Sequence, residues 1–134
     1  MAKITDQMKD IASKAKGFAL ATATKDGDPH VIPVGFGKVL SDEEVLLINV
    51  FMKKTLENIV ANPNVAVSVW DYDGLKGYEF KGTARIETSG NTFENSVKMV
   101  KSVFPQFDAK AAVVVKVDSI YDVTPGPEAG KLVA

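Results

Sequence analysis

Lys53, Lys54 and Thr55 stand where the sequence changes from one expected element to another. They follow an apolar run over residues 45–51, which predicts a strand, and they open a short helical segment that an Asn-Pro pair would end. The first turn of a helix has unpaired N–H groups and partial positive charge, so it binds anions such as phosphate. The lysines would add formal charge, Thr55 a hydroxyl and Asn58 an amide. The alternative is that both lysines simply point into solvent.

Other catalytic chemistry has few candidates in this sequence. His30 is the sole histidine and follows a predicted turn, where a solvent-facing position is expected. Because the sequence has no cysteine, thiol nucleophiles and thiolate metal sites are excluded, and no metal site is expected. No glycine-rich dinucleotide fingerprint follows a strand. Any redox chemistry would therefore come from a bound cofactor that the protein holds and tunes.

Length and composition are those of one globular domain over residues 1–134. Hydrophobic residues make up 46% and charged residues 25%, and the formal net charge is -1. This charge gives no basic footprint for nucleic acid, and no apolar run is long enough to cross a bilayer. Neither nucleic acid nor a membrane is an expected partner. The N-terminus lacks the layout of a signal peptide, which together with the missing cysteines favours a cytoplasmic location.

The elements expected around the lysine–threonine segment are mostly strands. Strands are predicted over residues 18–24, 30–40, 45–51, 65–70, 78–87 and 111–117, the last plausibly continuing to 123. Pro33, Gly35 and Gly37 leave the middle of the second strand open to a ligand. About six strands in hairpin succession, with three helices at the ends and at one crossover, predict a mainly β fold. We expect a closed or nearly closed antiparallel barrel.

Three local features complete the prediction. Thr5 or Asp6 can cap a first helix, and Asn91 has the form of a capping residue for the third. Gly82 is expected to form a β-bulge. The tail over residues 124–134 has no periodicity and would be mobile unless it docks on something.

Four stretches carry a resemblance to a known family: KDGDPHVIPV, DEEVLLIN, MKKTLENIVANPNVAVSVWD and YEFKGTARI. They resemble the FMN-binding split barrels related to pyridoxamine 5'-phosphate oxidase, and most closely its small single-domain FMN-binding proteins. The resemblance covers about residues 18–117. It implies a six-stranded antiparallel Greek-key split barrel that forms a homodimer, with one FMN at each end of the interface.

The resemblance places the FMN phosphate on Lys53, Lys54 and Thr55. The isoalloxazine ring would then lie along the backbone of residues 32–36, with residues 49–52 forming the other wall. No catalytic residue and no metal ligand is implied. The cofactor-binding residues that the resemblance implies are Ile32, Pro33, Val34, Gly35, Phe36, Asn49, Val50, Phe51, Met52, Lys53, Lys54, Thr55 and Asn58.

The sequence also departs from pyridoxamine 5'-phosphate oxidase proper, which binds its substrate phosphate with several basic residues. Arg85 is the only arginine here, a surface role is the simpler expectation for it, and the chain is much shorter than that enzyme. We therefore expect an FMN-binding oxidoreductase or electron carrier without that substrate specificity. In the family the partner chain closes the site, and the candidates for this role here are Trp70, Tyr78 and residues 125–131. The alternative is that Trp70 belongs to the core and that the tail is disordered. A competing hypothesis is a non-catalytic module that binds a deazaflavin, a nucleotide or a haem.

Overall fold

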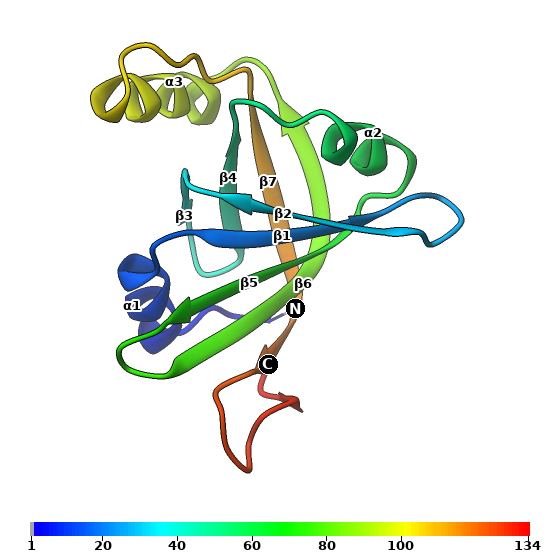
Figure 1. Cartoon of the computed structure of the whole chain (residues 1–134), viewed down its shortest axis with the longest axis vertical. Coiled ribbons are helices and arrows are strands. Elements are labelled where there is room, and N and C mark those ends of the chain that lie inside the picture. Colours follow the sequence, from blue (N-terminus) through cyan, green and yellow to red (C-terminus); the bar gives the residue numbers. More distant parts are fainter. Residues whose placement is uncertain (1) are drawn as a thin grey trace.

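The computed structural model describes residues 2–134 (Figure 1). It contains three helices and eight strands in these residues. In chain order these are α1 (Asp6–Lys14), β1 (Phe18–Ala23), β2 (Pro29–Val34), β3 (Gly37–Val39), β4 (Glu44–Asn49), α2 (Lys54–Ala61), β5 (Asn64–Asp71), β6 (Lys76–Glu87), α3 (Asn91–Val103), β7 (Ala111–Asp122) and β8 (Lys131–Leu132).

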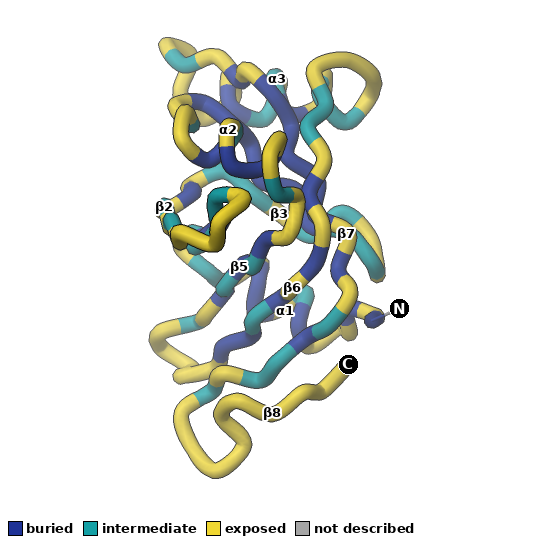
Figure 2. The backbone as a smooth tube through the Cα atoms, turned by 90° about the vertical axis from the view of Figure 1, so that its right-hand side faces the viewer, coloured by how far each residue is buried: buried dark blue, intermediate teal, exposed yellow. Residues whose placement is uncertain are grey.

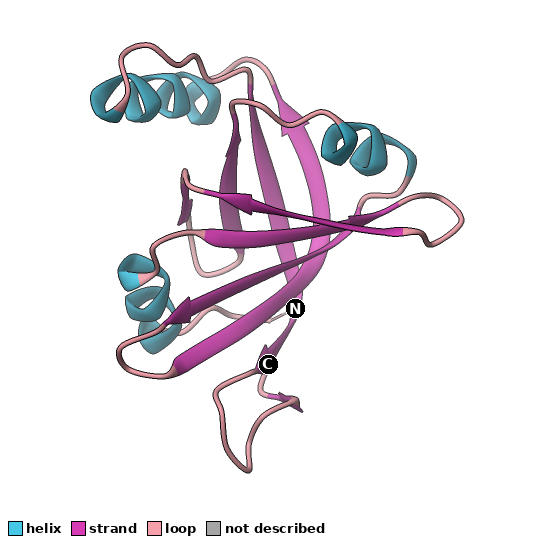
Figure 3. Ribbon diagram, viewed as in Figure 1, coloured by secondary structure: helices cyan, strands magenta, loops and turns pink. Residues whose placement is uncertain are grey.

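All strands belong to one antiparallel sheet with the order β2-β1-β5-β6-β7-β4-β3, and β8 pairs with β7. The two outer strands of this order, β2 and β3, follow each other in sequence, so the sheet curls back on itself (Figure 1). The helices lie at the margins of the curled sheet (Figure 3).

The predicted mainly β split barrel is confirmed, but it has eight strands where six were expected. The strand predicted over residues 30–40 is interrupted at residues 35–36, which separates β2 from β3. The chain changes partner there, because β2 pairs with β1 and β3 pairs with β4. The carbonyl of Phe36 accepts the amide of Ile48 at 2.8 Å, which extends the β3–β4 pairing by one residue. The eighth strand comes from the tail, where residues 131–132 pair with β7.

Two apolar clusters explain the unbroken apolar run that predicted β4. Val45 and Leu47 point into the cluster enclosed by the curled sheet. Leu46 and Ile48, on the other face, belong to a second cluster that includes Val100 of α3. Because alternate residues of a strand face opposite sides, β4 must be apolar on both of its faces. The strand predicted from this run is therefore present, and it is covered on both faces.

The helix starts agree with the prediction in one case and differ in another. Thr5 caps α1, and its Oγ1 accepts the amide of Met8 at 3.3 Å. The capping role predicted for Asn91 is wrong, because α3 begins at Asn91 itself and Gly90 holds the cap position without a side-chain hydrogen bond. Gly90 has φ +89°, a conformation that glycine adopts without strain.

The bulge predicted at Gly82 is confirmed by a register shift between Lys81 and Gly82 in the β6–β7 ladder. A Cβ atom at Gly82 would lie 1.9 Å from the carbonyl oxygen of Lys116. The close approach of the two backbones therefore requires glycine at this position.

The tail docks on the sheet through β8, where Leu132 pairs with Tyr121. Residues 125–134 of the tail are nevertheless exposed (Figure 2). Tyr78, one of the candidates for closing a partner's site, is buried in the core of its own chain. Arg85 lies on the surface as predicted, where it pairs with Glu44 and Glu87.

Among residues 2–134, no helix is both long enough and apolar enough to span a bilayer.

Candidate functional site

A cavity of ≈ 490 Å³ lies where β2, the end of β4 and the start of α2 meet. All the predicted cofactor-binding residues line it except Asn49 and Asn58. Three residues that the sequence did not predict, His30, Ile48 and Phe107, also line it. His30, which was expected to face solvent, is half-buried there.

The β2 side of the cavity is open because of its residue types. Pro33 has no N–H to donate to a neighbouring strand, and β2 pairs only with β1. At Gly35, no atom lies within 4 Å of the position that a Cβ would take, beyond the glycine and its chain neighbours. The backbone of this segment can therefore be approached closely by a flat ligand.

The first turn of α2 ends at the same cavity and is rich in unpaired donors. Lys53 holds the N-cap position without a side-chain hydrogen bond, and the first helical bond runs from the Glu57 amide to the Lys53 carbonyl at 3.2 Å. Within residues 2–134, the amides of residues 54–56 thus have no protein acceptor. Thr55 is 1% exposed, and its Oγ1 has no hydrogen-bond partner.

The start of α2 carries more positive than negative charge, since Lys53 and Lys54 face one acidic residue in the first turn, Glu57. Lys53 and Lys54 are exposed, and neither forms an ion pair in the described part of the protein. Cations at a helix N-terminus are unfavourable unless an anion lies nearby. Two ammonium groups, free amides and a buried hydroxyl together form a site suited to an anion.

The two predicted ligands outside the cavity lining are engaged within the protein. Asn49 Oδ1 accepts the amide of Met52 at 2.7 Å, which shapes the linker between β4 and α2. Asn58 Nδ2 donates to Thr22 Oγ1 at 3.0 Å, and both side chains are buried. The family resemblance implied both asparagines as cofactor-binding residues, and Asn58 was also expected to offer an amide one turn after the lysines.

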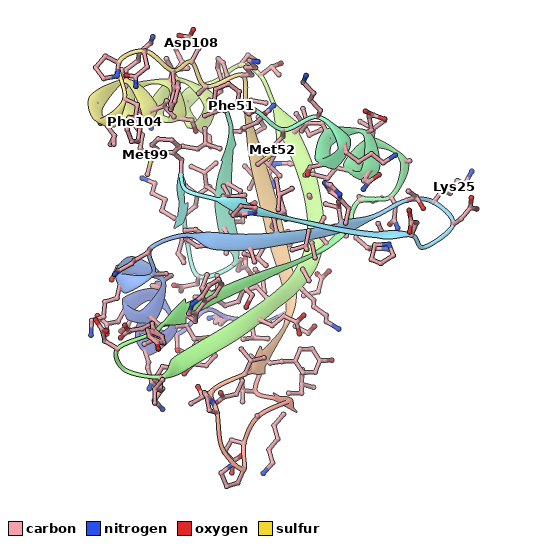
Figure 4. All side chains as sticks on the ribbon, viewed as in Figure 1. Lys25, Phe51, Met52, Met99, Phe104 and Asp108 are labelled. Carbon is pink, nitrogen blue, oxygen red and sulfur yellow. The ribbon has the colours of Figure 1, made fainter. Side chains whose placement is uncertain are left out.

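Aromatic rings from three separate segments of the chain meet beside the cavity. Phe51 and Phe107 meet edge to face with ring centroids 5.3 Å apart, and Phe104 lies 5.4 Å from Phe107 and 5.9 Å from Phe36. Figure 4 shows Phe51 and Phe104 at the same end of the molecule, near Met52. Phe107 was missed because its segment follows α3, far from the other lining residues in the chain.

An ion pair holds the segment that carries Phe107. Lys101 Nζ lies 2.7 Å from Asp108 Oδ1 and 2.9 Å from the carbonyl of Pro105. The hydrogen bond from Lys101 lowers the pKa of Asp108 below its ordinary value.

Across residues 2–134, no group of three or more histidine and carboxylate side chains could hold a metal ion.

Comparisons with known proteins agree with this architecture. An uncharacterized protein of Methanocaldococcus jannaschii is 38% identical over 134 residues, which is 98% of this chain and 89% of that protein. The crystal structure of HupZ from group A Streptococcus is 28% identical with a TM-score of 0.82, and the match covers 95% of this chain and 99% of that one.

A more distant structure shows the same fold. It is an FMN-binding protein from Syntrophomonas wolfei, 16% identical with a TM-score of 0.75, and the match covers 87% of this chain and 86% of that one. The sequence pattern of one family, described as pyridoxamine 5'-phosphate oxidase, matches residues 4–124. That match spans most of the chain, and the chain therefore belongs to the pyridoxamine 5'-phosphate oxidase family.

Proposed function

We propose that the protein binds FMN, with the phosphate at the first turn of α2 and the ring in the cavity beside β2. The observation that carries this proposal is the Thr55 hydroxyl, which is buried at the cavity without a partner. A buried polar group without a hydrogen bond costs about 1–3 kcal/mol, so a partner from outside the chain is favoured. A phosphate would accept from this hydroxyl and from the free amides of the same turn.

The remainder of the cavity suits a flat ring system. Its walls are mainly apolar and aromatic, and the open space beside Gly35 leaves room against the backbone. Phe51 and Phe107 offer ring surfaces at the cavity edge, and they would limit the access of water to the ring. A bound flavin would supply hydride or single-electron transfer, and the chain would hold it and orient it.

This arrangement supports a small oxidoreductase or electron carrier rather than an enzyme with its own acid–base residues. Among the described residues 2–134, His30, Lys53 and Lys54 are the titratable side chains that line the cavity. In this proposal the protein lacks the substrate specificity of pyridoxamine 5'-phosphate oxidase, since Arg85 lies on the surface in ion pairs with Glu44 and Glu87.

The cofactor is tested by the absorbance spectrum of the purified protein, before and after incubation of the ligand-free form with FMN. The proposal predicts a flavin spectrum and tight uptake of FMN. Parallel titrations with a deazaflavin, a nucleotide and haem should show weaker binding. Preference for any of these, or no uptake of flavin, would overturn the proposal.

The chemistry is tested with the flavin-loaded protein in the absence of oxygen. Rapid bleaching of the flavin band by NADH or NADPH would support an enzyme that uses a nicotinamide donor. A flavin that responds only to a chemical reductant, and then passes electrons to an added acceptor, would support a carrier. A protein whose flavin is reduced by neither would contradict a redox role.

We also propose a homodimer that uses the outer face of β1 and β2. Val31 is 64% exposed, and it is paired across the ladder with Ala21, while the exposed Pro33 is paired with Ala19. Small apolar residues on an open sheet face are suited to close contact with another protein surface. Pro33 also lines the cavity, so a second copy on this face would cover the cavity edge.

The dimer is tested by light scattering on the wild type and on Val31→Asp. The substitution should produce a monomer and weaken FMN binding, because it places a charge within the contact. Leu75→Asp is the matched control, since Leu75 is an exposed apolar residue in the turn between β5 and β6. A monomeric wild type, or a Val31→Asp variant that remains dimeric, would contradict this interface.

A further inference from the structure

Asn58 of α2 and Asn62, the residue at the C-cap of α2, tie this helix to β1 and to the turn that follows β1. Asn58 Nδ2 donates to Thr22 Oγ1 at 3.0 Å, and Asn62 Nδ2 donates to the carbonyl of Thr24 at 3.3 Å. The asparagines are one helical turn apart, so they lie on the same face of α2. Their two partners are two residues apart in the chain. The helix is thus fixed at two points along its length.

These ties matter because the apolar contacts of α2 are few, with Ile59 buried in the core and Leu56 packed against it. The helix has eight residues, of which three are buried, and two of these three, Thr55 and Asn58, are polar. An apolar contact is non-directional, whereas a hydrogen bond fixes both distance and angle. The Asn58–Thr22 bond, which is buried on both sides, therefore fixes the rotation of α2 about its axis more narrowly than the packing of Ile59 and Leu56 does.

The same rotation decides where Thr55 points, because Thr55 precedes Asn58 by three residues and shares its side of the helix. We infer that Asn58 and Thr22 are positioning residues that aim the first turn of α2 at the cavity, and so set the preference for a phosphorylated flavin over an unphosphorylated one. This inference rests on the proposed function. Thr22 does not line the cavity and acts only through Asn58.

The test compares FMN with riboflavin, which lacks the phosphate, in the wild type, Thr22→Val and Thr22→Ser. Thr22→Val keeps the side-chain shape and removes the acceptor of Asn58. The ratio of riboflavin to FMN dissociation constants should fall about fivefold, the equivalent of one hydrogen bond, while riboflavin affinity stays unchanged. Thr22→Ser retains the hydroxyl and should restore the ratio. Asn62→Ala, which removes the second tie near the surface, should change the ratio in the same direction and serves if Thr22→Val does not fold.

The possible results separate this inference from the proposed function. An unchanged ratio in the folded Thr22→Val and Asn62→Ala variants would overturn the positioning role. Equal losses of FMN and riboflavin affinity would also overturn it, because they would indicate general damage to the cavity. A wild type that binds neither flavin would instead refute the proposed function, and it would do so before any variant is compared.

Discussion

Replacing Thr55 by valine should affect the free protein and its anion complex in opposite directions. Threonine and valine are both β-branched and have similar shapes, so the helix propensity changes little. In the ligand-free protein, the Thr55 Oγ1 is buried without a partner, which costs about 1–3 kcal/mol. Thr55→Val should therefore raise the free energy of unfolding of the ligand-free protein by up to about this amount.

The same substitution removes one hydrogen bond to a charged phosphate. Such a bond contributes about 1.5–3 kcal/mol, so the Kd of FMN should increase roughly 10- to 150-fold. Riboflavin has no phosphate to contact the hydroxyl. Its Kd should be the same for the wild type and for Thr55→Val.

Flavin fluorescence quenching gives the two dissociation constants, and urea unfolding followed by circular dichroism gives the free energy of unfolding. Thr92→Val is the matched control, because Thr92 is the second residue of α3 as Thr55 is of α2, and it does not line the cavity. The control should leave FMN affinity unchanged. A less stable Thr55→Val variant with wild-type FMN affinity would refute the reasoning, since its hydroxyl would then act within the protein.

Three further predictions concern the cavity, the pH dependence of stability and the bulge. Gly35→Ala should leave the unfolding midpoint nearly unchanged, because its Cβ meets no other part of the protein, but it should weaken flavin binding in a fluorescence titration; unchanged affinity would show that the ring lies elsewhere. The hydrogen bond from Lys9 lowers the pKa of Asp42 below 3.8, so this carboxylate stabilises the fold above that pH, and its contribution is lost as the pH falls through the lowered pKa. Asp42→Asn should accordingly flatten the decrease in stability below about pH 3.8 in acid titrations followed by circular dichroism, and an unchanged curve would contradict the pairing. Gly82→Ala should destabilise the protein by several kcal/mol, of the order of severe overpacking, because its Cβ would overlap the Lys116 carbonyl; a wild-type urea midpoint would show that the bulge adapts.

The order and type of the elements could be predicted because local patterns determine them. β4 is apolar on both faces because it lies between two apolar clusters, and Gly82 marks a bulge because the neighbouring backbone leaves no space for a Cβ. The division of one predicted strand into β2 and β3 depends on a change of partner, since β2 pairs with β1 and β3 pairs with β4. That change is decided by pairing between strands, and no periodicity in the sequence records it.

The candidate site could be predicted in part for the same reason. Lys53, Lys54 and Thr55 form a local pattern, a helix start with donors and positive charge, and the structure has that helix start at the cavity. Phe107 reaches the cavity through the segment after α3, and Asn58 bonds to Thr22, which precedes it by 36 residues. Both placements depend on tertiary contacts, which a pattern of neighbouring residues in the sequence does not contain.

The most direct test of the account is the pair of dissociation constants of FMN and riboflavin for the wild-type protein, measured at the same pH and ionic strength. Several charge-assisted contacts to the phosphate, each contributing about 1.5–3 kcal/mol, predict that FMN binds at least about a hundredfold more tightly. Equal affinities for the two flavins would show that no phosphate rests at the start of α2, and would contradict the account.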